Sequence, residues 1–127
     1  CHLGRFGGFI DEPREIIKSI ENVSLVEMEN SGLDSHCCGG GSAMFMSYPE
    51  IGIEISKRRY REAEASGAEI ILTFCPMCEH TLRKGAEFIA REEIDFDEDY
   101  DFDNPPPPPE PKIKVLNLIE WLLPLRN

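Results

Sequence analysis

Five cysteines in three groups are the feature that most constrains this chain of 127 residues. Cys1 stands alone, Cys37 and Cys38 are adjacent, and Cys75 and Cys78 form a Cys-x-x-Cys pair. An odd number leaves one thiol over in any intramolecular disulfide scheme, and nothing in the sequence suggests export. We therefore expect a reducing compartment, the cytoplasm, in which clustered cysteines hold metal or carry out redox chemistry.

The size of the chain fits one domain, residues 1–127, which can bury a core without needing metal to hold it together. Because the sequence begins at Cys1 and not at a methionine, we expect it to be a piece of a longer polypeptide. Its apolar stretches are too short to cross a bilayer, so we expect it not to span a membrane, and any membrane association would come through a partner subunit.

The acidity of the chain is concentrated in one segment. The net charge is −11, but eight of the 24 acidic residues lie within residues 92–104, which contain no Lys or Arg. Because the sequence carries no basic stripe, we expect no nucleic acid partner. Acidic and proline-rich residues 95–111 are predicted to form an insertion that is extended and solvated.

Hydrophobic periodicity predicts an alternation of helices and strands. Asp11 is expected to cap the first helix, Pro49 and Pro76 to open the next two, and Gly67 to stop the second. The expected helices cover residues 11–20, 49–66, 76–93 and 118–125, and the expected strands cover residues 23–28, 69–74 and 112–116. This order predicts an α/β fold, with a small, largely parallel sheet flanked by helices.

Each cysteine group is predicted to lie in a loop or at a helix start. Because the loops after successive parallel strands gather along one edge of a sheet, the cysteine site is expected at that loop edge. Thiolates suit zinc, copper(I) and iron–sulfur clusters. Adjacent Cys37 and Cys38 suit a cluster of several irons better than one tetrahedral ion, and five ligands exceed the four of structural zinc. Gly39, Gly40 and Gly41 would let the backbone approach inorganic sulfides and donate N–H bonds to them.

The three cysteine motifs together resemble a known family. Cys1-His-Leu-Gly-Arg, Cys37-Cys38-Gly-Gly-Gly and Cys75-Pro-Met-Cys78 are similar to the cysteine-rich CCG domain of heterodisulfide reductase catalytic subunits and of iron–sulfur subunits in glycolate and lactate oxidation. The resemblance implies an α/β domain that holds a noncubane [4Fe–4S] cluster. It implies that the cluster ligands are Cys1, Cys37, Cys38, Cys75 and Cys78.

The same resemblance sets expectations for function and partners. It implies the iron–sulfur cluster domain of a heterodisulfide-reductase-like oxidoreductase, active in electron transfer and in disulfide reduction. Family members carry two copies of the motif, and this chain resembles the second copy. The implied partners are the upstream CCG half, a ferredoxin-like region or subunit, and other redox subunits. The resemblance names no catalytic residue.

Two alternatives stay open at this stage. One is a zinc-binding structural or interaction domain on the same scaffold. The other is a thiol-disulfide redox centre, because a strand followed by Cys75-Pro-Met-Cys78 at a helix start resembles the motif of thioredoxin-type folds. The second alternative leaves Cys1, Cys37 and Cys38 without a role.

Four further residues flank the cysteines. His2, His36 and His80 each lie near one cysteine group and could donate a hydrogen bond to a cluster sulfide. The simpler interpretation of each is a polar loop or helix residue. Arg5 follows Cys1 closely and is a candidate to contact an anion or to cap the first helical region.

Overall fold

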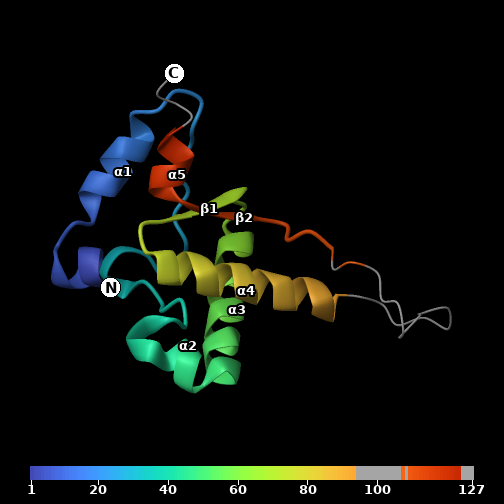
Figure 1. The fold of residues 1–127 in the computed structure, drawn as a ribbon. Coiled ribbons are helices and arrows are strands. Elements are labelled where there is room, and N and C mark those ends of the chain that lie inside the picture. The colour runs from blue at the N-terminus through green and yellow to red at the C-terminus, as the bar shows by residue number, and fades with distance from the viewer. Residues whose placement is uncertain (94–106, 108, 124–127) are drawn as a thin grey trace.

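The computed structural model describes residues 1–93, 107 and 109–123. Its centre is a small sheet in which β1 (Ile70–Thr73) pairs in parallel with β2 (Lys114–Asn117). In Figure 1, α3 (Pro49–Ala65) and α4 (Pro76–Glu92) lie below the sheet, and α1 (Asp11–Lys18) and α5 (Leu118–Leu122) lie above it. The predicted α/β fold with helices flanking a parallel sheet is confirmed.

Four shorter helical segments complete the described part of the chain. They are η1 (His2–Phe6), η2 (Gly32–Asp34), η3 (Gly41–Ala43) and α2 (Met44–Ser47). No helix of the described residues has both the length and the apolar character needed to cross a bilayer.

The core lies between the sheet and the helix pair α3 and α4. Its apolar members come from both strands and both helices: Tyr60, Ala63, Ile71, Leu82, Ala86, Ile89, Ile113 and Val115. The two helices approach closely at Gly85, where a Cβ atom would lie 2.5 Å from Ser56 Oγ. Ser56 Oγ also donates a hydrogen bond to the carbonyl of Thr81 across this contact, at 2.6 Å. The close crossing fixes α4, and with it the cysteines at its start.

Tyr60 anchors the chain as it enters β2. Its side chain is 1% exposed, its hydroxyl accepts from the Ile113 amide at 2.7 Å, and it donates to the Ile113 carbonyl at 3.1 Å. Tyr60→Phe leaves both backbone groups without this partner, so we expect the free energy of unfolding to fall by about 2 kcal/mol. Urea unfolding of both proteins measures the difference. Tyr48→Phe is the matched control, because Tyr48 is 56% exposed, and equal stability of the two variants would contradict the anchoring role.

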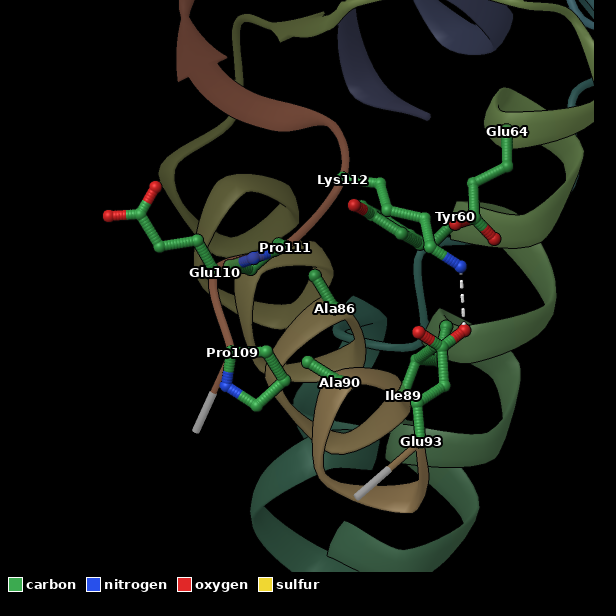
Figure 2. Close-up of a pocket in the computed structure, with 10 residues that line it drawn as sticks. All are labelled: Tyr60, Glu64, Ala86, Ile89, Ala90, Glu93, Pro109, Glu110, Pro111 and Lys112. Carbon is green, nitrogen blue, oxygen red and sulfur yellow. Dashed lines mark hydrogen bonds and ion pairs between the residues drawn. The ribbon is translucent and has the colours of Figure 1, made fainter. Parts of the chain in front are cut away.

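A cavity of about 180 Å³ lies beside Tyr60, between α3, α4 and the residues that precede β2 (Figure 2). Lys112 and Glu93 form an ion pair at its rim with a distance of 2.7 Å. Both side chains are at least half exposed, so the pair contributes little to stability. No cysteine lines this cavity, which separates it from the candidate site.

Most of the predicted elements are present with small changes of boundary. The helices and strand on either side of Gly67 agree with the prediction, and Pro49 and Pro76 lie in the first turns of α3 and α4. The terminal strand is shifted to Lys114–Asn117, and α5 ends at Leu122. Residues 94–106, 108 and 124–127 lie outside the described part, and with them most of the predicted insertion 95–111.

Two expectations near the N-terminus are wrong. Residues 23–28 form no strand. Within the described residues, β1 and β2 pair only with each other. Met28 is half-buried against the core, so the alternating pattern serves packing without strand pairing. Asp11 is the first residue of α1 and not its cap; Ile10 holds the cap position without a side-chain bond. The carboxylate of Asp11 in the first turn still suits the helix dipole.

Candidate metal centre

The fold brings the three cysteine groups toward one edge of the sheet. Cys1 immediately precedes η1, and Cys37 and Cys38 lie in the loop between η2 and η3. Cys75 holds the cap position of α4 directly after β1, and Cys78 lies in the first turn of that helix. The carboxyl end of β1 therefore delivers the last cysteine pair to the site.

Four of the five cysteines line one cavity of about 250 Å³. They are Cys1, Cys37, Cys38 and Cys78, and β1 supplies part of the wall through Ile71, Leu72 and Thr73. Cys75 is exposed and is not part of this lining. All five cysteines are free thiols. The site thus joins all three groups, with Cys75 at its margin.

The free thiols of Cys38 and Cys78 lie close enough to each other to shift one another's pKa. The hydrogen bond from Cys78 lowers the pKa of Cys38 to about 5, against the effect of burial, and the Thr81 hydroxyl and the Gly40 amide lower it further. The same bond raises the pKa of Cys78, which keeps its proton, and burial raises it further. Since the thiolate is the form that binds metal, Cys38 is prepared as a ligand at neutral pH.

Backbone amides of the glycine loop point at the cysteine sulfurs. The Gly39 amide donates to Cys37 Sγ at 3.3 Å, and the Gly40 amide donates to Cys38 Sγ at 3.5 Å. The two glycines also allow close packing: a Cβ at Gly39 would lie 2.2 Å from the Gly52 carbonyl oxygen, and one at Gly40 would lie 2.6 Å from Met77 Cγ. An N–H donated to a ligand sulfur stabilises the thiolate. Contact of the glycine triplet with inorganic sulfide stays a prediction.

The donor set suits thiolate-bound metal, and its spread bears on the kind of metal. Within the described residues, which include every cysteine, no three His, Cys, Asp or Glu side chains are gathered around one point. A structural zinc needs its ligands about 2.3 Å from a single centre. A cluster of several irons distributes its ligands over several atoms.

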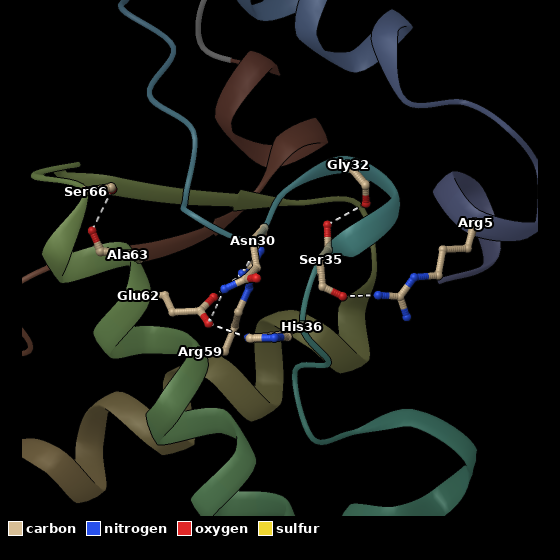
Figure 3. Close-up of polar contacts among 9 residues, drawn as sticks. All are labelled: Arg5, Asn30, Gly32, Ser35, His36, Arg59, Glu62, Ala63 and Ser66. Atoms are coloured by element: carbon tan, nitrogen blue, oxygen red, sulfur yellow. Dashed lines mark hydrogen bonds and ion pairs between the residues drawn. The ribbon is translucent and has the colours of Figure 1, made fainter.

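A polar network attaches the cysteine loop to α3 (Figure 3). His36 Nδ1 pairs with Glu62, whose carboxylate also accepts from Arg59 and, at 3.2 Å, from Asn30 Nδ2. Arg59 further donates to the Asn30 carbonyl at 2.8 Å. His36 was a sequence candidate because it precedes Cys37, but its partners on α3 leave no sequence signal. The network fixes the chain just before the adjacent cysteines.

The other two histidines each contact an aromatic ring. His2 lies 6.1 Å from Phe6 between ring centroids, at the exposed N-terminal turn. His80 meets Phe45 edge to face at 5.5 Å. These contacts agree with the simpler interpretation of both residues.

The Glu62 network predicts acid sensitivity. Burial raises the pKa of Glu62, but the bonds from Arg59 and His36 outweigh it and hold the pKa below the ordinary 4.5. A carboxyl with a depressed pKa stabilises the folded state above its unfolded pKa, and this stability is lost as pH falls through the folded pKa. We expect the metal-free protein to lose stability below about pH 4.5 more steeply than Glu62→Gln does. Urea unfolding from pH 6 to pH 3 compares the slopes, and equal slopes would show that Glu62 adds nothing.

The site and fold define a cysteine-rich α/β domain. A family model described as a cysteine-rich domain, CCG, matches residues 1–83. The chain belongs to this CCG cysteine-rich domain family, as its three motifs indicated.

Several curated relatives share this region. The chain is 33% identical over 87 residues to a subunit of the dihydromethanophenazine:CoB–CoM heterodisulfide reductase of Methanosarcina mazei, a match that covers 68% of this chain and 21% of that protein. It is 39% identical over 87 residues to the probable iron-sulfur-binding oxidoreductase FadF of Bacillus subtilis, covering 68% and 12%. It is 33% identical over 87 residues to a subunit of the fumarate reductase (CoM/CoB) of Methanothermobacter marburgensis, covering 68% and 17%.

The matched region spans about a fifth or less of the length of these relatives. No solved structure matches the chain.

Proposed function

We propose that this chain is the iron–sulfur cluster domain of a heterodisulfide-reductase-like oxidoreductase. The observation that carries the proposal is that free cysteines from all three sequence groups line one cavity. The names of the relatives, which include heterodisulfide reductase and iron-sulfur-binding oxidoreductase, support it. When bound, the cluster supplies one-electron transfer.

The proposed ligands are all five motif cysteines, Cys1, Cys37, Cys38, Cys75 and Cys78, around a [4Fe–4S] cluster of noncubane type. Adjacent cysteines and a ligand number above four favour that type over an ordinary cubane. The amides that donate to the sulfurs of Cys37 and Cys38 would help hold the negative charge of the ligands.

The proposed partners and reaction follow from the relatives. Those named as subunits belong to larger complexes, so electrons are proposed to pass between this domain and an upstream CCG half, a ferredoxin-like region or subunit, and other redox subunits. Disulfide reduction is the proposed reaction of the whole protein, and the cytoplasm is its proposed location.

One observation weighs against a thiol-disulfide centre at Cys75 and Cys78. In such a centre the reactive thiolate belongs to the Cys-x-x-Cys pair. Here Cys78 lines one cavity with Cys1, Cys37 and Cys38, which a centre of two thiols would leave without a role. Cys78 is therefore proposed to act together with the adjacent cysteines.

Metal analysis tests the proposal directly. Iron, zinc and acid-labile sulfide are measured in anaerobically prepared protein, and visible spectra are recorded before and after reduction. We expect iron and sulfide in near-equal amounts, with an absorption band that bleaches on reduction. One equivalent of zinc without sulfide would overturn the proposal in favour of the zinc-binding structural domain.

A further inference from the structure

Arg5 joins two of the three cysteine groups. Its Nε donates to the Leu33 carbonyl at 2.9 Å, and its guanidinium also donates to the Ser35 carbonyl (Figure 3). Arg5 lies in η1, the turn that begins directly after Cys1, whereas Ser35 lies two residues before Cys37. One side chain thus ties the turn that carries Cys1 to the loop that carries the adjacent cysteines.

The partners of Arg5 differ from those of the other arginines at the cavity. Arg14 pairs with Glu27, and Arg59 pairs with Glu62. In the part of the chain that the structure describes, Arg5 forms no ion pair with a carboxylate, and its donors go to backbone carbonyls. Two carbonyls two residues apart match the rigid fork of a guanidinium, which the single ammonium of lysine does not reproduce.

Among the described residues, few other contacts hold the turn that carries Cys1. No residue of η1 is buried, and Phe6 is 85% exposed. A ligand on such a turn must be ordered when metal binds, and the loss of conformational freedom reduces affinity unless other contacts have ordered it beforehand. The two bonds of Arg5 supply such contacts.

We propose that Arg5 is a positioning residue that holds Cys1 at the cavity it shares with Cys37, Cys38 and Cys78. The paired donors of its guanidinium, and not its positive charge alone, hold the turn in place. The effect of Arg5 on cluster binding rests on the proposed function. Its effect on the turn that carries Cys1 rests on the two hydrogen bonds alone.

Three variants separate geometry from charge. Arg5→Gln removes the fork and the charge, and Arg5→Lys removes only the fork. Arg61→Gln removes one positive charge from an exposed position of α3 that does not line the cavity. Metal-free protein is titrated with ferrous iron and sulfide, and the visible absorption is followed. We expect both Arg5 variants to need about tenfold more iron for half occupancy, the loss expected from a hydrogen bond to a charged group. Arg61→Gln should match the unaltered chain, because Arg61 lies outside the cavity lining.

A second readout needs no metal. In metal-free protein, hydrogen exchange is measured at the amides that close η1, such as Phe6 bonded to the Cys1 carbonyl and Gly7 bonded to the His2 carbonyl. In both Arg5 variants, these amides should exchange faster than in the unaltered chain. The amides of α3 and α4 should exchange at the same rate as in the unaltered chain. Unchanged exchange in η1, or normal iron binding by Arg5→Lys, would overturn the proposal. Failure of the unaltered chain to bind iron would instead overturn the proposed function, while the exchange result would still test Arg5.

Discussion

Replacing Cys37 or Cys38 with serine is expected to reduce the iron and sulfide content of the protein to near zero. Both sulfurs accept backbone amides, and Cys38 is the thiol whose pKa is lowered to about 5. A serine hydroxyl stays protonated at neutral pH and is a poor ligand for iron. Each change therefore removes one ligand and leaves the Gly39 or Gly40 amide without the sulfur to which it donates. Iron and sulfide per chain, with the visible spectrum, measure the effect.

The same measurement distinguishes the thiol-disulfide hypothesis. That hypothesis predicts that Cys75→Ser alone abolishes function, whereas Cys37→Ser and Cys38→Ser are tolerated. Ser47→Ala is a suitable control, since Ser47 is exposed in α2 and does not line the cavity. Full iron and sulfide in both Cys37→Ser and Cys38→Ser would contradict the role of the adjacent pair as cluster ligands.

Local sequence signals predicted the central elements well because their causes are local. Pro49 and Pro76 suit the first turn of a helix, and Gly67 adopts a φ of +75° directly after the helix that it stops. The compact apolar run between them became β1 with Ile71 buried. The strand predicted at residues 23–28 is absent for the opposite reason. A strand must pair with the edge of another strand, and alternation of apolar and polar residues does not supply that partner.

The candidate site was predictable only in part. Cysteine spacing, with the rule that parallel strands gather their loops at one edge, predicted that the three groups meet, and four cysteines do line one cavity. The supporting contacts were not predictable. Arg5 reaches the Ser35 carbonyl 30 residues away, and Glu62 reaches His36 across 26. Such contacts follow from tertiary packing and leave no periodic pattern in the sequence.

The glycine loop shows how one sequence feature can have two physical causes. The triplet predicted close approach of the backbone to a cluster, and two of its amides do point at cysteine sulfurs. Gly39 and Gly40 are also required by packing, since α3 and α4 leave no room for a side chain at either position. Gly41 has open space where a Cβ would be placed. The three positions therefore differ in their tolerance of substitution.

Gly39→Ala is expected to destabilise the metal-free protein by about 3 kcal/mol or more. Gly39 has a φ of +88°, which costs a residue with a side chain about 1 kcal/mol or more. The added methyl would lie 2.2 Å from the Gly52 carbonyl oxygen, and backbone on α3 must shift to relieve the overlap, at a cost of about 1–3 kcal/mol. Urea unfolding of metal-free protein measures the change without any contribution from bound metal.

Gly41→Ala is the matched control, because it adds the same methyl group two residues along the same loop, into open space. Its free energy of unfolding should stay within about 0.5 kcal/mol of the unaltered chain. If the Gly39 and Gly41 variants unfold at the same urea concentration, the close contact between the cysteine loop and α3 is absent in solution. If only Gly39→Ala is destabilised, the loop that carries Cys37 and Cys38 is held by packing against α3 before any metal binds, and the amides that donate to their sulfurs are fixed in advance.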